Sequence, residues 1–218
     1  MLRIDLTVPW GPEIQPLEGH PRVGFSPITT HAVEGRSNTR VEFSIHTGTH
    51  IDSPYHFVPG GKTIDQMPLD VFIGAARLVD LTAVASPRHA VTLDELLATG
   101  LTEEAARGKR VVLRTDWATE HWRLPDLYTK NPFLREDAAR WLRDAGIAAL
   151  GLDFAVDAEF PYPNHYVFLE NEIVLIENLI NLDQIPVPEF TLVALPLRVV
   201  RGDGGPARAV ALVDEVES

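Results

Sequence analysis

The chain has 218 residues, a formal net charge of −12 at pH 7 and no cysteine. The acidic excess argues against a nucleic acid or an anionic membrane as partner. The lack of cysteine excludes disulfides, thiolate metal ligands and a cysteine nucleophile. Hydrophobic residues make up 45% of the chain, which predicts one domain over residues 1–218. Because no apolar run reaches membrane-spanning length and the first residues lack a signal-peptide pattern, we expect a cytoplasmic location.

The first elements predicted along the chain are two strands separated by a long loop. Polar and apolar residues alternate over residues 3–8, which predicts a strand. Residues 9–27 are rich in proline and glycine and predict a loop long enough to form a lid or a pocket wall. A further strand is predicted over residues 41–45, and it leads into a segment rich in histidine.

This histidine segment, HTGTHIDSPYH, is the most informative part of the sequence. Imidazole and carboxylate groups, the usual ligands of zinc, manganese and iron, fall at its even positions: His46, His50, Asp52 and His56. A straight strand would hold the first and third of these about 20 Å apart, whereas metal–ligand bonds are about 2 Å long. The chain must therefore curl after His46. Gly48 permits the curl because it tolerates positive φ, and Pro54 ends strand pairing.

The second half of the chain alternates strands with short helices. Thr92, with Glu95 three residues later, forms a capping box that predicts a helix over residues 92–97. A second helix is predicted over residues 135–144, before Gly146. Strands are predicted over residues 77–81, 111–114, 148–152 and 173–176, followed by an antiparallel pair over residues 190–200 and 207–213. The pattern indicates a mixed α/β domain.

Further metal ligands are expected downstream, since a catalytic centre usually draws ligands from separated segments. His165 follows a proline-rich loop, and on its own it is more simply interpreted as a loop histidine. Glu177 ends an apolar run, where a carboxylate is either buried beside a site or exposed at a strand end or helix cap. Asp153 and Asp157 follow a predicted buried strand and are weaker candidates, because such residues more often cap the next element.

The first motif, His-x-Gly-Thr-His-x-Asp-x-Pro-x-His, resembles the signature of the cyclase-like metal-dependent hydrolases. This family includes bacterial kynurenine formamidase and isatin hydrolase. Residues 4–7 and 176–184 and the spacing between His165 and Glu177 are also similar to the family pattern. The resemblance implies a mixed-sheet α/β fold with a swivelling β/β/α arrangement and assembly as a homodimer or a larger homo-oligomer.

The resemblance also implies roles for the candidate residues. His46 and His50 would hold one ion and His165 a second, with Asp52 and Glu177 as bridges. His56 would be the general acid/base. Isatin hydrolase members use a single manganese, so one or two divalent ions, zinc or manganese, are expected. The implied reaction is hydrolysis of a carbon–nitrogen bond in an aryl formamide or cyclic amide by a metal-activated water, with lactone or ester hydrolysis as the alternative.

The substrate side departs from the family pattern. Kynurenine formamidases of this family carry a tryptophan in the N-terminal loop that packs on the aromatic substrate. Leu17 stands at the comparable position here, with His20 in place of an acid, which predicts weak use of formylkynurenine. Trp10, Leu17 and Phe25 are the candidates to line an apolar pocket for a small-molecule substrate, although each could equally pin the loop to the core.

Two other classes of protein use similar ligands. His50, Asp52 and His165 match the two-histidine, one-carboxylate set of non-haem iron oxygenases. That interpretation leaves His46, His56 and Glu177 without a role, and residues 166–177 offer no arginine or lysine for an oxoglutarate cosubstrate. A structural metal site is usually closed, four-coordinate and rich in cysteine. Turnover of an ester or amide that a chelator abolishes would separate these classes from a hydrolase.

Overall fold

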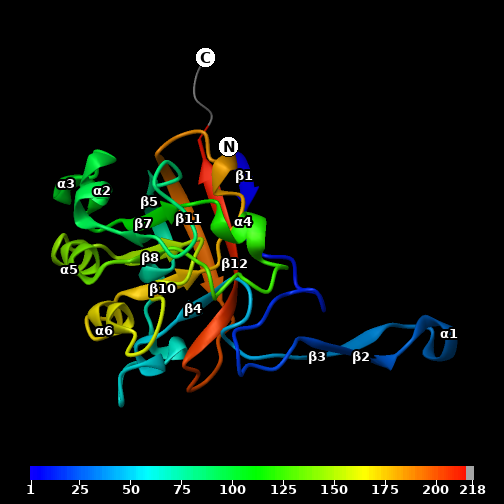
Figure 1. Cartoon of the computed structure of the whole chain (residues 1–218). Helices are drawn as coiled ribbons and strands as arrows, with labels where there is room; N and C mark the ends of the chain where they lie inside the picture. Colours follow the sequence, from blue (N-terminus) through cyan, green and yellow to red (C-terminus); the bar gives the residue numbers. More distant parts are fainter. Residues whose placement is uncertain (215–218) are drawn as a thin grey trace.

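The computed structural model describes residues 1–214, and its centre is a curled, mixed eight-stranded sheet (Figure 1). In spatial order its strands are β1 (Leu2–Asp5), β12 (Gly204–Val213), β11 (Glu189–Pro196), β5 (Ile73–Asp80), β7 (Arg110–Arg114), β9 (Ala149–Leu152), β10 (Val174–Glu177) and β4 (His50–Asp52). β4 also pairs with β12, which closes the sheet on itself. The run from β5 to β10 is parallel, and the other pairings are antiparallel.

Helices cover one side of the sheet, as Figure 1 shows. They are α2 (Leu93–Ala98), α3 (Glu103–Ala106), α5 (Glu136–Asp144) and α6 (Pro163–Leu169). A large apolar core, including Leu96, Leu142 and Phe168, fills the space between these helices and the sheet. A second core fills the inside of the curl, with Ile51, Phe72 and Ile176 among its members. β9 and β10 are buried along their whole length, as expected for parallel strands covered on both faces.

Several shorter elements also belong to the body of the protein. They are α4 (Trp117–His121), the paired strands β6 (Ala90–Val91) and β8 (Phe133–Leu134), and the 3-10 helices η1 (Pro54–His56), η2 (Ile64–Gln66), η3 (Leu69–Val71) and η4 (Leu182–Gln184). None of the helices in residues 1–214 combines the length and apolar character needed to cross a membrane.

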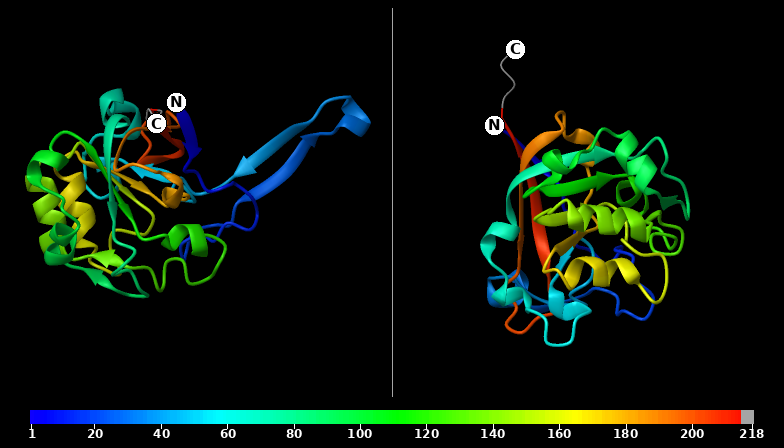
Figure 2. Two further views of the ribbon diagram at one scale, coloured as in Figure 1. Left: turned by 90° about the horizontal axis from the view of Figure 1, so that it is seen from above. Right: turned by 90° about the vertical axis from the view of Figure 1, so that its left-hand side faces the viewer.

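A two-stranded arm projects away from this body (Figure 2). It consists of β2 (Gly24–Thr29), the short tip helix α1 (His31–Glu34) and β3 (Asn38–Glu42). The arm corrects two predictions. The loop predicted over residues 9–27 becomes strand at residue 24, and the strand predicted over residues 41–45 ends at residue 42. Both strands are exposed, so they lack the buried alternation from which a strand is predicted.

The other predicted elements agree with the structure apart from their ends. α2 begins at the predicted capping box, in which the Glu95 N–H donates to the Thr92 hydroxyl at 3.2 Å. The strand predicted over residues 3–8 stops at Asp5, because Thr7 pairs only through an isolated bridge with Leu179. The strand predicted over residues 190–200 stops at Pro196. The mixed α/β fold class is confirmed.

Candidate active site

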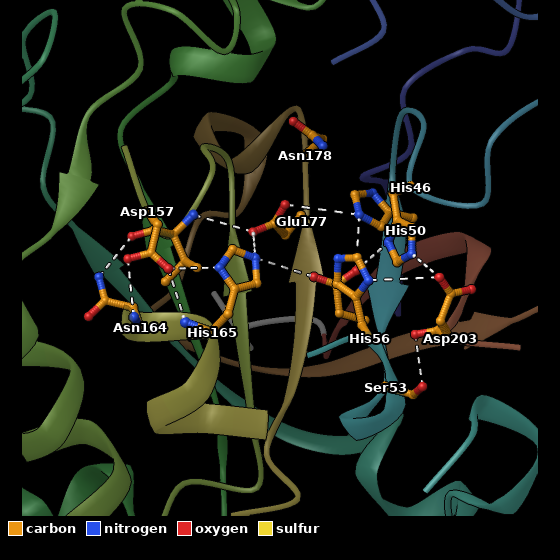
Figure 3. Close-up of polar contacts among 12 residues, drawn as sticks. His46, His50, Ser53, His56, Asp157, Asn164, His165, Glu177, Asn178 and Asp203 are labelled. Atoms are coloured by element: carbon orange, nitrogen blue, oxygen red, sulfur yellow. Dashed lines mark hydrogen bonds and ion pairs between the residues drawn. The ribbon is translucent and has the colours of Figure 1, made fainter. Parts of the chain in front are cut away.

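The site lies where β4 and β10 run side by side (Figure 3). His50 and Asp52 are two residues apart on β4 and therefore share one face of the sheet. Glu177, the last residue of β10, pairs directly with His50 and projects from the same face. Before β4 the chain turns at Gly48, whose φ is +65°, and this turn brings His46 back beside Asp52. The predicted curl after His46 is thus present.

The first group of side chains gathers around one oxygen of Asp52. Its Oδ1 lies 2.7 Å from Nδ1 of His46 and 3.2 Å from Nε2 of His50. The same His50 Nε2 lies 4.0 Å from Oε2 of Glu177. Two imidazoles and two carboxylates therefore meet at the ends of β4 and β10, and Asp52 and Glu177 are both almost completely buried.

The second group forms on the opposite side of the same carboxylates. Nε2 of His165 lies 3.8 Å from Oδ2 of Asp52 and 4.0 Å from Oε1 of Glu177. Each carboxylate thus presents one oxygen towards His50 and the other towards His165. Carboxylates in this position can bridge two cations.

Hydrogen bonds fix the orientation of two of the imidazoles. The Nδ1 of His50 lies 2.8 Å from the carbonyl oxygen of Gly48, and the Nδ1 of His165 lies 2.7 Å from Oδ2 of Asp157. Each ring therefore turns its Nε2 towards the carboxylates, as metal-ligating histidines do. Asp157 also accepts the backbone N–H groups of Asn164 and His165, at 3.1 and 3.0 Å. His165 thus sits in the first turn of α6, which corrects its predicted place in a loop.

His56 is held beside this cluster by stacking. Its ring lies on that of His46 with 3.8 Å between centroids, and its Nδ1 is 3.8 Å from Oδ2 of Asp203. Asp203 also lies 3.1 Å from Nε2 of His46. The sequence analysis missed Asp203, for which the available signal was the glycine-rich turn around it. Gly204 is needed there, because a Cβ would lie 2.5 Å from the Ile51 carbonyl oxygen and 2.9 Å from the His46 ring.

The protonation of these groups follows from burial and from their neighbours. Burial opposes the charge on His46, but Asp52 and Asp203 raise the pKa of His46 to about 9. Burial lowers the pKa of His56 to about 4, with His46 and His165 acting in the same direction. Burial would raise the pKa of Asp52, yet His46 and His50 hold it well below its usual value. Burial and the adjacent charge of Asp52 raise the pKa of Glu177.

The donor set suits a divalent ion. Ligand atoms of two trios lie within 4.8 Å of one another, namely His46 with Asp52 and His56, and His50 with Asp52 and Glu177. All are nitrogen or oxygen donors, which zinc and manganese accept. A cation between the two buried carboxylates would also relieve the repulsion that raises the pKa of Glu177.

A cavity of about 780 Å³ lies beside these residues. Its lining includes Leu17, His20, Tyr128 and Tyr162. Tyr162 lies edge-on to His165, with 6.1 Å between centroids. The Tyr128 hydroxyl is 3.3 Å from Nδ2 of Asn178, the residue after Glu177. These two tyrosines lie between the cavity and the histidine–carboxylate cluster, whose own side chains are not among the lining residues. Tyr128 carried no signal in the sequence analysis, whereas Asn178 lies in the segment 176–184 that resembles the family pattern.

The three residues predicted to contact substrate lie in different parts of the structure. Leu17 lies in the wall of this cavity. Trp10 packs edge-on against Phe43 at 4.3 Å and covers Gly48, so it supports the turn before β4. Phe25 lies on the arm. Of the two weaker acidic candidates, Asp157 orients His165, whereas Asp153 binds Thr115 and Asp116 and does not join the cluster.

Comparison with known proteins agrees with this geometry. The family model described as "Putative cyclase" matches residues 4–158. The chain is 31% identical over 211 residues to kynurenine formamidase of Bacillus cytotoxicus, covering 95% of each chain. Its identity to the kynurenine formamidase of Salinibacter ruber is 35% over 179 residues, or 78% of this chain and 77% of that one. The chain therefore belongs to the putative cyclase family, and it is a metal-dependent hydrolase.

Solved structures agree with this family membership. Isatin hydrolase A of Labrenzia aggregata, bound to benzyl benzoate, superposes with a TM-score of 0.86 at 27% identity, covering 98% of this chain and 94% of that one. A predicted metal-dependent hydrolase of Bacillus stearothermophilus gives a TM-score of 0.78 at 29% identity, covering 96% and 97%. The predicted family resemblance and the predicted fold are both confirmed.

Proposed function

We propose that the chain holds one or two divalent transition ions, zinc or manganese, in the cluster at the ends of β4 and β10. The proposed ligands are His46, His50, Asp52, His165 and Glu177. The observation that carries this proposal is that both carboxylates face His50 with one oxygen and His165 with the other. Ions bound there would supply a water that ionises near neutral pH and would polarise a carbonyl oxygen.

His56 is the proposed general acid/base. It lies beside the cluster rather than between the carboxylates, and its side chain is 25% exposed, so a substrate can reach it from solvent. The stack on His46 fixes the plane of its ring. From this position its imidazole can take a proton from an attacking water and return it to the departing nitrogen.

The proposed reaction is hydrolysis of a carbon–nitrogen bond in an aryl formamide or a cyclic amide. This substrate class is supported by the likeness to kynurenine formamidases and isatin hydrolases. The cavity also offers Leu17, Tyr128 and Tyr162 as apolar and aromatic surface for a ring. Leu17 is the proposed contact to that ring, and Trp10 supports the turn at Gly48 that positions His46.

Purified protein assayed against a panel of substrates tests this proposal. The panel contains formylkynurenine, a simple formanilide, isatin, and a lactone of similar size. We expect hydrolysis of at least one of the three carbon–nitrogen substrates, loss of activity with a chelator, and recovery with zinc or manganese. Because Leu17 offers no aromatic stack, formylkynurenine should be turned over below about 10⁴ M⁻¹s⁻¹. Activity on the lactone alone would replace the amide proposal with lactone hydrolysis.

The remaining proposals concern assembly and location. A homodimer is proposed here on the family resemblance, and size measurement in solution tests it. The cytoplasm is the proposed compartment, and fractionation of cells that express the chain tests that placement.

A further inference from the structure

The Tyr128 hydroxyl lies beside the candidate active site, yet the proposed reaction gives it no role. Tyr128 lines the 780 Å³ cavity, and its hydroxyl oxygen is 3.3 Å from Nδ2 of Asn178. Asn178 directly follows Glu177, and Figure 3 shows both residues at the cluster. The Tyr128 ring is half-buried and packs against the apolar core beneath the helices. This hydroxyl therefore lies between the space for a substrate and the buried carboxylates.

The hydrogen of this hydroxyl is available to a molecule in the cavity. Nδ2 of Asn178 also lies 3.2 Å from the carbonyl oxygen of Gly48, and a carbonyl oxygen can only accept. The amide nitrogen must therefore occupy that position, so it donates to the Tyr128 oxygen rather than accepting from it. Within residues 1–214 the Tyr128 hydroxyl makes no hydrogen bond as a donor, which leaves its hydrogen without a partner in the protein.

The orientation of the Asn178 amide is unfavourable for stability alone. The side chain is almost completely buried, and its Oδ1 finds no hydrogen-bond partner in the part of the chain that the structure describes. A buried acceptor without a partner destabilises a fold and calls for an explanation. With the amide turned over, Oδ1 could accept the Tyr128 hydroxyl hydrogen. The observed orientation instead keeps that hydrogen free for a substrate.

The backbone around Tyr128 is fixed before any substrate binds. The indole N–H of Trp117 donates to the carbonyl oxygen of Leu127 at 2.8 Å, and Leu127 itself is buried. The backbone N–H of Lys130 donates to the carbonyl oxygen of Asp126 at 3.0 Å. A donor that is already in place stabilises a developing negative charge without reorganisation during the reaction.

The surroundings of the hydroxyl keep it protonated. Burial raises the pKa of Tyr128 above its ordinary value, and the charges of Glu177 and Asp52 act in the same direction, whereas the hydrogen bond from Asn178 opposes them. A phenol of this kind offers a hydrogen bond at neutral pH and does not release its proton. It is therefore suited to face a developing negative charge and unsuited to act as a base.

We infer that Tyr128 is a further catalytic residue whose hydroxyl donates a hydrogen bond to the carbonyl oxygen of the substrate, and that Asn178 is the positioning residue that directs it. When water attacks the carbonyl carbon, His56 takes one of its protons, a carbon–oxygen bond forms, and the π-electron pair moves to the oxygen that Tyr128 faces. When this pair returns, the carbon–nitrogen bond breaks and the nitrogen leaves with the proton from His56. The Tyr128 proton stays on its own oxygen throughout.

The first test removes the hydroxyl and keeps the ring. Tyr128→Phe should lower kcat on formanilide about 100-fold or more, the usual loss for one such donor. KM, metal content and melting temperature should stay close to those of the parent. Tyr166→Phe is the matched control, because it removes a hydroxyl from a ring that is 41% exposed, and it should behave like the parent. An unchanged kcat in Tyr128→Phe, or a loss explained by lost metal or stability, would overturn the inference.

The second test asks whether the hydroxyl acts on the carbonyl oxygen. Thioformanilide replaces this oxygen with sulfur, which is a weaker hydrogen-bond acceptor. Tyr128→Phe should therefore lower kcat/KM much less on thioformanilide than on formanilide, by about tenfold or less. If the parent hydrolyses isatin rather than formanilide, isatin and its 2-thiocarbonyl analogue form the matched pair. Equal losses on the oxygen and sulfur substrates would show that the hydroxyl acts elsewhere.

The third test concerns Asn178. Its φ is +56°, a left-handed conformation that glycine adopts freely, so Asn178→Gly removes the side chain and keeps the backbone. We expect kcat on the oxygen substrate to fall about tenfold, as for other residues that orient a catalytic group. The double variant with Tyr128→Phe should be no slower than Tyr128→Phe alone, because Asn178 acts through that hydroxyl. Losses that multiply would overturn the positioning role of Asn178.

The inference rests on the proposed function, and the assays distinguish the failure of each. A parent that hydrolyses none of the carbon–nitrogen substrates would overturn the proposed function and the role of Tyr128 with it. An active parent together with an equally active Tyr128→Phe would overturn the role of Tyr128 alone.

Discussion

The chain buries two kinds of carboxylate, and the groups that face them differ. Asp153 accepts the N–H and hydroxyl of Thr115 and the N–H of Asp116, at 2.5–3.0 Å. Asp52 faces His46 and His50 on one side and His165 on the other. Glu177 is placed in the same way, and it accepts the backbone N–H of Val156 at 3.3 Å.

This difference distinguishes a carboxylate that stabilises the fold from carboxylates that can bind a cation. A carboxylate saturated by backbone N–H groups and a hydroxyl holds two chain segments together and has no lone pairs directed elsewhere. A carboxylate that faces imidazole nitrogens keeps its lone pairs directed at a shared space, where a cation can replace the imidazole protons. Asp157 combines the two roles, since it binds the start of α6 and orients His165.

The largest effect is expected from Asp52→Ala. This change removes the side chain that faces both groups of histidines, so elemental analysis should find the metal lost, and activity should be undetectable. Asp153→Asn is the matched control, because it alters an equally buried carboxylate outside the cluster and should retain the metal. If Asp52→Ala binds metal as tightly as the parent, the proposed ligand set is wrong.

A smaller effect is expected from His56→Ala. Its imidazole stacks on His46 and does not lie between the carboxylates, so the metal content should be kept while kcat falls about 100-fold or more, as for other general acids and bases. His121→Ala is the control, since that ring stacks on Trp117 away from the site. Parallel loss of metal and activity would identify His56 as a ligand instead.

Asp157→Asn should have an intermediate to small effect. The change weakens the hydrogen bond that orients His165, and such supports are worth about 10–100-fold in metal affinity or activity. Metal affinity by competition with a chelator is the measurement. Asp137→Asn removes a carboxylate that accepts a backbone N–H at the start of α5 without touching a histidine, and it should bind metal like the parent. Equal losses in both variants would mean that helix capping alone explains the effect.

Much of this centre was predictable because it is local in sequence. The ligand types and spacing of residues 46–56 predicted the turn at Gly48, and an apolar run ending in Glu177 predicted a carboxylate at a strand end. The capping box at Thr92 correctly predicted the start of α2 for the same reason, since its donor and acceptor are three residues apart.

The features that could not be predicted from the sequence depend on contacts between residues far apart in the chain. Asp203 is 157 residues from His46 and reaches it only because β12 pairs with β4. The arm was missed because its strands are exposed and so lack the buried alternation from which a strand is predicted. His165 lies in a helix because Asp157 accepts the first backbone N–H groups of α6. A contact of this kind leaves no periodic pattern in the sequence from which it could be predicted.

The smallest effect concerns Asp153 and appears in stability rather than activity. Burial raises the pKa of Asp153 to about 7, against the hydrogen bonds from Thr115 and Asp116 that favour its charge. In the unfolded chain its pKa is about 3.9. Between these values the folded state holds a proton that the unfolded state has released, so this group's contribution to the free energy of unfolding falls as pH rises from about 4 to about 7.

Asp153→Asn stays neutral throughout this range, so its stability should lack that part of the pH dependence. The destabilisation that the variant shows relative to the parent should be largest at about pH 4 and should shrink towards pH 8. Melting temperatures of both proteins at matched pH and metal content measure this, and about 1 kcal/mol moves a chain of this size by about 2–4 °C. The exposed Asp94→Asn serves as control and should follow the parent. A difference between Asp153→Asn and the parent that stays constant with pH, or grows towards pH 8, would show that Asp153 is ionised in the folded protein throughout. Its hydrogen bonds would then outweigh burial, and the contrast with the carboxylates of the site would rest on geometry alone.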